Sequence, residues 1–159
     1  MAKVILICGK ICCGKSTYAK ELCKGGRGVQ LSVDALMLAL FGQHAGAMHD
    51  EYVRRIKTHL LDLSVQIIHS GSDVILDWGF WTKDERAAVK QFFADRQIPC
   101  EMHYLDISDA VWQARIAHRN QLVAEGRSDD YYVDEALAQK FAGLFQTPAQ
   151  DEIDVSPLD

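Results

Sequence analysis

The sequence predicts an α/β protein in which helices cover both faces of a parallel sheet. Short apolar runs alternate with helical segments along the 159 residues, the order typical of parallel strands joined by crossover helices. The runs are almost continuously apolar, as in strands that are buried on both faces. The first of them, at residues 4–8, leads directly into a glycine-containing loop and a helix. The predicted strands are residues 4–8, 29–33, 74–76 and 99–105.

Four of the six predicted helices are marked by a local signal. Gly25 and Gly71 follow helical segments and favour a helix C-terminus. Thr82 and Glu85 form a capping box, and Ser108 is a good N-cap for the segment after the fourth strand. The predicted helices are residues 16–24, 35–41, 51–70, 82–96, 108–119 and 133–145.

The loop after the first strand has the spacing G-x-x-x-x-G-K-[ST] of a phosphate-binding loop. A loop of this kind, ahead of a helix start, points backbone N–H groups at the β-phosphate of a nucleotide. We expect Lys15 to reach the β- and γ-phosphates and the Ser16 hydroxyl to bind Mg²⁺. The predicted nucleotide-binding residues are Gly9, Lys10, Ile11, Cys12, Cys13, Gly14, Lys15, Ser16 and Thr17.

Two aspartates are expected at the edge of the sheet where α/β proteins bind ligands. Asp34 follows the second strand, where a carboxylate can accept the proton of a substrate hydroxyl. It can also serve as the N-cap of the next helix, and the two roles are compatible. Asp77 follows the strand at 74–76, which suits a magnesium-organising acid but is also common for a turn residue.

A pair of arginines follows the fourth strand. Arg115 and Arg119 are four residues apart and share one helix face. Cations on a movable segment can neutralise charge on a transferred phosphoryl group, whereas a solvated basic face is the plainer interpretation. Residues 120–130 are polar and contain Gly126, so we expect a lid at about residues 115–130.

Composition narrows the class of protein. The length fits a single domain over residues 1–159. A net charge of −5 argues against a broad basic surface for nucleic acid. The five cysteines are odd in number and suggest no disulfide framework, so we expect a cytoplasmic location. No apolar run is long enough for a signal peptide or a membrane span, and no pattern indicates the oligomeric state.

These residues make the chain resemble the small AAA-33-type P-loop kinases, which are related to zeta toxins, chloramphenicol phosphotransferase and the kinase domain of polynucleotide kinase. The resemblance is carried by residues 9–17, 32–36, 76–80 and 115–120. It implies a three-layer P-loop fold with the sheet order 2-3-1-4-5 and a substrate-hydroxyl base at Asp34. It also implies that Arg115 packs on the adenine and that Arg119 contacts the γ-phosphate.

Two segments depart from that family pattern. Ile11, Cys12 and Cys13 stand where many relatives have Pro-Gly-Ser, which strains the loop if residue 12 needs a positive φ. The end of the chain leaves only residues 152–155 for a fifth strand. The two loop cysteines have a further interpretation, because a helix N-terminus and a nearby lysine lower thiol pKa values and raise reactivity. The alternative is that these small side chains only fill the loop.

The sequence favours an ATP-dependent kinase that phosphorylates a hydroxyl group of a small molecule. Mg-ATP would bind at residues 9–17, with Asp77 beside the metal and Asp34 taking the proton. Lys15, Arg115 and Arg119 would stabilise the transferred charge. The closest rival is a polynucleotide 5′-hydroxyl kinase, which the acidic charge and the lack of a basic, aromatic-interleaved run disfavour. A third possibility is a regulatory module that binds a nucleotide without acceptor-dependent turnover.

Overall fold

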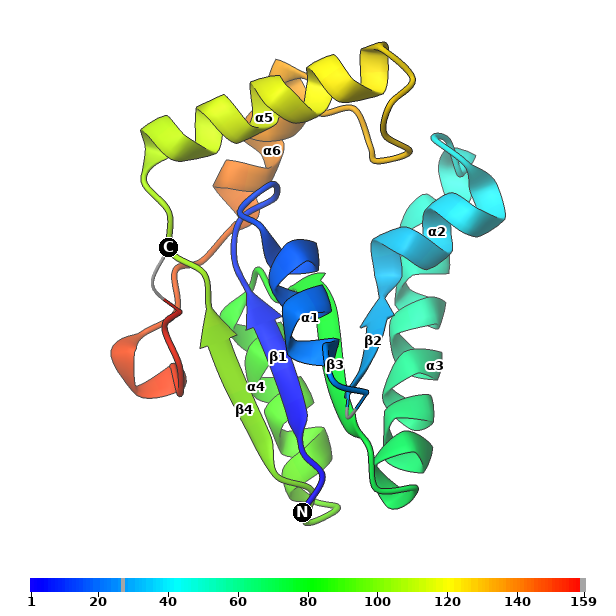
Figure 1. The fold of residues 1–159 in the computed structure, drawn as a ribbon, viewed down its shortest axis with the longest axis vertical. Helices are drawn as coiled ribbons and strands as arrows, with labels where there is room; N and C mark the ends of the chain where they lie inside the picture. The colour runs from blue at the N-terminus through cyan, green and yellow to red at the C-terminus, as the bar shows by residue number, and fades with distance from the viewer. Residues whose placement is uncertain (27, 158–159) are drawn as a thin grey trace.

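A parallel sheet of four strands lies at the centre of the protein, in the order β2-β3-β1-β4 (Figure 1). The computed structural model describes residues 1–26 and 28–157. Residues 27, 158 and 159, which the single-domain prediction includes, lie outside the described residues. The strands are β1 (Val4–Cys8), β2 (Gly28–Ser32), β3 (Asp73–Gly79) and β4 (Cys100–Tyr104).

Helices cover both faces of this sheet, so the predicted fold class is confirmed. Figure 1 shows α1 in front of the sheet, α4 behind it and α5 across the end at which the strands finish. The helices are α1 (Lys15–Cys23), α2 (Val33–Phe41), α3 (His49–His69), α4 (Lys83–Ala94), α5 (Asp109–Ala124) and α6 (Glu135–Leu144), with short 3-10 helices η1 (Gly46–Met48) and η2 (Gln150–Glu152). No helix among the described residues is long and apolar enough to cross a membrane.

The continuous apolar run of β1 is explained by burial on both faces. Val4 and Leu6 belong to the larger core cluster, which also contains residues of α2, α3 and α4. Ile5 and Ile7 point to the opposite face and pack with Ala19 of α1. Because side chains alternate along a strand, both sets must be apolar.

The prediction of a fifth strand is wrong, because the described sheet has four strands. Residues 153–157 form only one isolated bridge, between Val155 and His103 of β4. The Asp154 carboxylate accepts the Met102 N–H at 2.8 Å, so a side chain takes one of the donors that a longer ladder would use. Pro157 follows two residues after the bridge and has no N–H to donate. The described sheet therefore ends at β4, with one bridged residue in the fifth position.

Three element boundaries differ from the predictions in ways that affect the site. β3 continues to Gly79, which pairs with Cys8, so Asp77 lies within the strand and not after it. α2 begins at Val33 because the Ser32 hydroxyl accepts the Ala35 N–H at 3.2 Å. The N-cap is thus Ser32, and the alternative interpretation of Asp34 as the N-cap is wrong. α5 continues to Ala124, so the first part of the expected lid is helical.

Candidate functional site

The loop between β1 and α1 crosses the sheet at the end of the strands, as its sequence predicts. Gly14 has a φ of 101° immediately before α1, which begins without a side-chain cap. A Cβ atom on Gly9 would lie 2.5 Å from Cys13 Sγ, and one on Gly14 would lie 3.0 Å from Arg115 Nη1. Gly9 therefore has no room for a side chain, and the φ of Gly14 is one that other residues rarely adopt. The loop thus leads into an open helix N-terminus, the geometry that binds phosphate.

Lys15 lies folded over this loop. Its Nζ donates to the Lys10 carbonyl oxygen at 2.6 Å and to the Gly9 carbonyl oxygen at 3.3 Å. The ammonium group is therefore held at the loop by backbone carbonyl oxygens, and neither of these two contacts is with a carboxylate. Thr17 lies exposed in the first turn of α1.

Ser16 and Asp77, expected at a metal, are brought together by α1 and β3. Asp77 Oδ2 accepts the Ser16 hydroxyl at 2.8 Å, and the carboxylate is buried with 3% exposure. Gln30 of β2 donates its Nε2 to the same oxygen at 2.9 Å. The sequence analysis missed Gln30, although alternation along β2 places it opposite the core-facing Leu31 and beside Ile75, on the face that α1 covers.

This donor set fits Mg²⁺ bound together with a nucleotide. Mg²⁺ keeps several waters and takes few protein ligands beside the phosphates, so the Ser16 hydroxyl with the Asp77 carboxylate behind it is sufficient. Among the described residues there is no group of three or more His, Cys, Asp or Glu side chains that could hold a metal alone. The arrangement is thus suited to a metal that arrives with its phosphate ligands.

Asp34 lies in the first turn of α2 and opens onto a cavity of about 1220 Å³ that Ser16, Gln30 and Arg119 also line. Its side chain is exposed to the cavity, but protein surrounds it on most other sides. This desolvation raises the pKa of the Asp34 carboxyl group, while the positive charge of Lys15 opposes the rise. A carboxylate with a raised pKa is a stronger base.

The two arginines of α5 occupy different places. Arg115 Nη1 donates to the Cys13 carbonyl oxygen at 2.6 Å and stands against Gly14. Arg119, one turn later, lines the cavity that also contains Asp34, and its charge lowers the pKa of that carboxyl group. One arginine is thus held on the loop, and the other faces the space between the loop and α2.

Residues of α5 that the sequence analysis did not single out hold the loop as well. Trp112 Nε1 donates to the Ile11 carbonyl oxygen at 2.7 Å. Lys10 forms an ion pair with Asp109 at 3.1 Å, and its Nζ lies 5.2 Å from the centroid of the Trp112 ring. A tryptophan close before the arginine pair was the available signal, because a buried indole N–H needs an acceptor.

Cys12 and Cys13 are core residues. Their exposures are 8% and 1%, and they pack in one cluster with Trp112 and Ile116 of α5. Burial raises the pKa of the Cys12 thiol and outweighs the opposing charges of Arg119 and Lys15. The expectation of a lowered thiol pKa is therefore wrong for Cys12. Its φ of 60° matches the strain anticipated for a residue that replaces glycine.

One family model matches the chain over residues 4–148, and its description is AAA domain (AAA-33). No match was found among curated proteins.

Several solved structures have the same fold. A sugar kinase from Janibacter sp. aligns with a TM-score of 0.66 and 15% identity, over 99% of this chain and 85% of that one. The APS kinase CysC from Mycobacterium tuberculosis aligns with a TM-score of 0.63 and 18% identity, over 98% and 87%. A chain of the Pnkp1/Rnl/Hen1 RNA repair complex aligns with a TM-score of 0.72 and 15% identity, over 90% and 43%. At these identities the likeness establishes a P-loop kinase-like fold.

Proposed function

The chain belongs to the AAA-33 family of P-loop proteins, and from that membership we propose that it is an ATP-dependent kinase for a hydroxyl group of a small molecule. The observation that carries the proposal is the position of Asp34, which opens onto the same cavity as Ser16 and Arg119. A module that only binds a nucleotide needs no base at that place. The similar folds of a sugar kinase and an APS kinase support the proposal.

In the proposed reaction each residue has a separate role. Bound Mg-ATP supplies the phosphoryl group and a metal that neutralises charge on the phosphates. The loop amides and Lys15 would hold the β- and γ-phosphates, and Ser16, with Asp77 behind it, would hold the metal ion. Asp34 accepts the proton of the attacking hydroxyl group. Arg119, which lines the same cavity, would stabilise the negative charge that develops on the transferred phosphoryl group.

A polynucleotide 5′-hydroxyl kinase is the second candidate, which the likeness to a chain of the Pnkp1/Rnl/Hen1 complex supports. It would use the same loop and the same base.

The five cysteines are all free, which agrees with the cytoplasmic location that we propose for the protein.

The proposal is tested by measuring ADP release with and without a panel of sugars, amino alcohols, nucleosides and 5′-hydroxyl oligonucleotides. The expected result is release that depends on one acceptor class. Nucleotide binding without any acceptor-dependent release would support the regulatory interpretation instead.

The first variant to examine is Lys15→Ala. Because the Lys15 ammonium group donates to carbonyl oxygens of the loop and would bind phosphate, we expect its loss to abolish ATP turnover and to leave the circular dichroism spectrum unchanged. Lys140→Ala, at an exposed lysine of α6 that is not on the cavity wall, is the matched control for a lost lysine. Full turnover in Lys15→Ala would exclude the phosphate role of the loop.

A further inference from the structure

The cavity at Asp34 extends well beyond the point of phosphoryl transfer. From Asp34 its wall continues along α2 to Gly42 and Gln43 and returns through residues 128–131 after α5. Gln43 Nε2 donates to the Asp130 carbonyl oxygen at 2.9 Å, so the end of α2 and the segment after α5 meet at the rim. A volume of about 1220 Å³ exceeds that of a typical small-molecule pocket. There is therefore room for an acceptor beside the phosphates.

The wall of this outer half is apolar and acidic. The α2 face presents Ala35, Leu36, Leu38 and Ala39. Opposite them, Ser128, Asp129, Asp130 and Tyr131 line the rim, and the Asp129 and Asp130 side chains are exposed. Together with Asp34, three carboxylates border the space in which an acceptor would lie.

The cations of the cavity come from α1 and α5. Among the described lining residues only Lys20 and Arg119 are basic. Lys20 follows Ser16 by one turn of α1, and the charge of Arg119 acts on Asp34 and on Cys12 of the loop. Lys57 also acts on Asp34, but its ammonium group is paired with Glu85 and is not on the cavity wall. Both lining cations thus lie on the helices that flank the phosphate loop, and the described walls formed by α2 and residues 128–131 contribute none.

We propose that the acceptor is a hydroxyl compound with an apolar body and no anionic group, and that an amine on it is accepted beside Asp129 and Asp130. An acceptor that carries a phosphate, sulfate or carboxylate would place like charges together, which opposes its binding. A phosphate group is normally recognised by clustered arginines or lysines, and the outer half has none among its described lining residues. This proposal rests on the proposed kinase function and excludes a polynucleotide as the acceptor.

Three compounds that share one body and differ in charge provide the test: phenylpropanol, phenylalaninol and phenyllactate. Their binding to the protein saturated with Mg-ADP is measured by ligand-observed NMR. The neutral alcohol and the amino alcohol are expected to bind at least about tenfold more tightly than the carboxylate. Binding of phenyllactate as tight as that of phenylpropanol overturns the proposal, and so does a failure of all three compounds to bind.

The variant Asp129→Lys should reduce the preference for phenylalaninol over phenyllactate by about tenfold. Asp62→Lys is the matched control, because it makes the same change in net charge at an exposed position of α3 that is not on the cavity wall. An equal effect of the two variants would show a long-range effect of net charge and would overturn the proposal. ADP release with the same compounds separates the two claims. Binding of the predicted order without acceptor-dependent release contradicts the kinase function and leaves the charge preference of the cavity intact.

Discussion

At the scale of single residues, Asp34 combines an exposed position in the cavity with a raised pKa. An aspartate whose pKa is higher in the folded protein than in the unfolded chain prefers to be protonated when folded. Its ionised form therefore lowers stability at every pH above the folded-state pKa, and this loss disappears below the unfolded-state value. A carboxyl group with a raised pKa that opens onto a cavity is a candidate for chemistry.

Asp34→Asn should consequently have two opposite effects. The rate of phosphoryl transfer is expected to fall by roughly 10²-fold or more because the base is removed, while Mg-ATP affinity stays nearly the same. The melting temperature at pH 7 should rise because the desolvated charge is gone, and the two proteins should become equally stable in acid, where Asp34 is protonated. Scanning calorimetry across pH and single-turnover kinetics give both results. A variant that is both active and no more stable would leave Asp34 as an ordinary residue of the first helical turn.

The loop cysteines provide a second prediction at this scale. Because Cys12 and Cys13 are buried and burial raises the pKa of the Cys12 thiol, both should be alkylated much more slowly in the folded protein than in urea. Cys23, which is only half-buried, is the internal reference. Mass spectrometry after timed iodoacetamide treatment measures the rates. Modification of Cys12 ahead of Cys23 would instead support a reactive loop.

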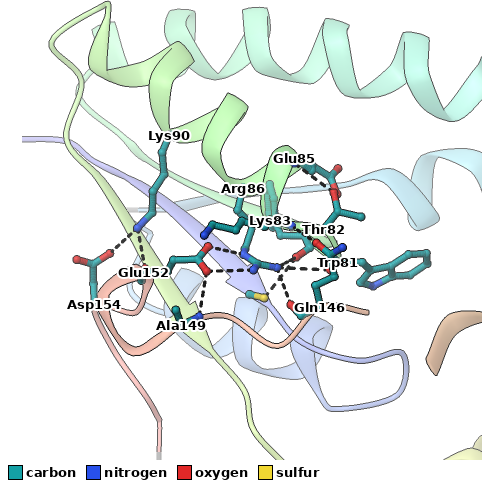
Figure 2. A network of polar contacts seen from close by, with 12 residues as sticks. Trp81, Thr82, Lys83, Glu85, Arg86, Lys90, Gln146, Ala149, Glu152 and Asp154 are labelled. Carbon is teal, nitrogen blue, oxygen red and sulfur yellow. Dashed lines mark hydrogen bonds and ion pairs between the residues drawn. The ribbon is translucent and has the colours of Figure 1, made fainter. Parts of the chain in front are cut away.

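At the scale of elements, a buried arginine attaches the C-terminal segment to α4 and β3 (Figure 2). Arg86 of α4 has a side-chain exposure of 1%, and its Nε and Nη2 donate to the Glu152 carboxylate at 2.8 and 3.2 Å. Its Nη1 donates to the carbonyl oxygens of Phe80 at 3.2 Å and of Gln146 at 2.8 Å. Gly9 N–H donates to the carbonyl oxygen of Gly79, the residue before Phe80. The contacts of Arg86 therefore adjoin the phosphate loop.

Glu152→Gln should therefore lower the free energy of unfolding by about 3 kcal/mol at pH 7, because the Arg86 charge stays buried without its partner. The hydrogen bonds from Arg86 lower the pKa of Glu152 to about 2. The stabilisation is accordingly complete above the unfolded-state pKa of a glutamate, and it is lost as pH falls through the folded-state value. The difference between variant and parent in urea unfolding should shrink as pH falls from 5 toward 3.

Glu51→Gln is the matched control for this prediction. The pKa of Glu51 is also lowered to about 2, by Arg54 and then Arg55, but the pair lies on the exposed surface of α3. We expect a much smaller effect there, because solvent screens exposed ion pairs. Equal effects in the two variants would show that burial of Arg86 contributes nothing.

At the scale of the whole molecule, α5 links the phosphate loop to α6. Trp112, Arg115 and Asp109 each contact the loop, and Cys12 and Cys13 complete the apolar cluster between the loop and the α5–α6 pair. The shape of the loop therefore depends on helices that begin about a hundred residues later in the chain.

Trp112→Ala should accordingly affect both stability and binding. We expect a loss of about 3–5 kcal/mol in the free energy of unfolding from the cavity created, together with weaker Mg-ATP binding in calorimetric titration. Trp112→Phe keeps an aromatic ring but removes the hydrogen bond to Ile11 and part of the buried ring volume, so a loss of about 1–3 kcal/mol, smaller than in Trp112→Ala, should be measured. Unchanged ATP affinity in the folded Trp112→Ala protein would show that α5 does not shape the loop.

The sequence by itself determined the parallel fold, the phosphate loop and the end of the sheet at which Asp34, Asp77 and the arginines gather. These features are local. Apolar runs, glycine positions and capping residues act within a few neighbours of the chain, so a pattern in one stretch is enough to predict them.

Only the tertiary structure decided which side chains meet. Gln30 and Asp77 are 47 residues apart, Arg86 and Glu152 are 66 apart, and Ile11 and Trp112 are 101 apart. The burial of Cys12 and the reduction of the fifth strand to one bridge also depend on such distant contacts. Packing sets these pairs through the relative placement of whole elements. The same thiol or carboxylate thus has a different pKa in water, on a helix surface and in a core, and no local pattern records which of these it will occupy.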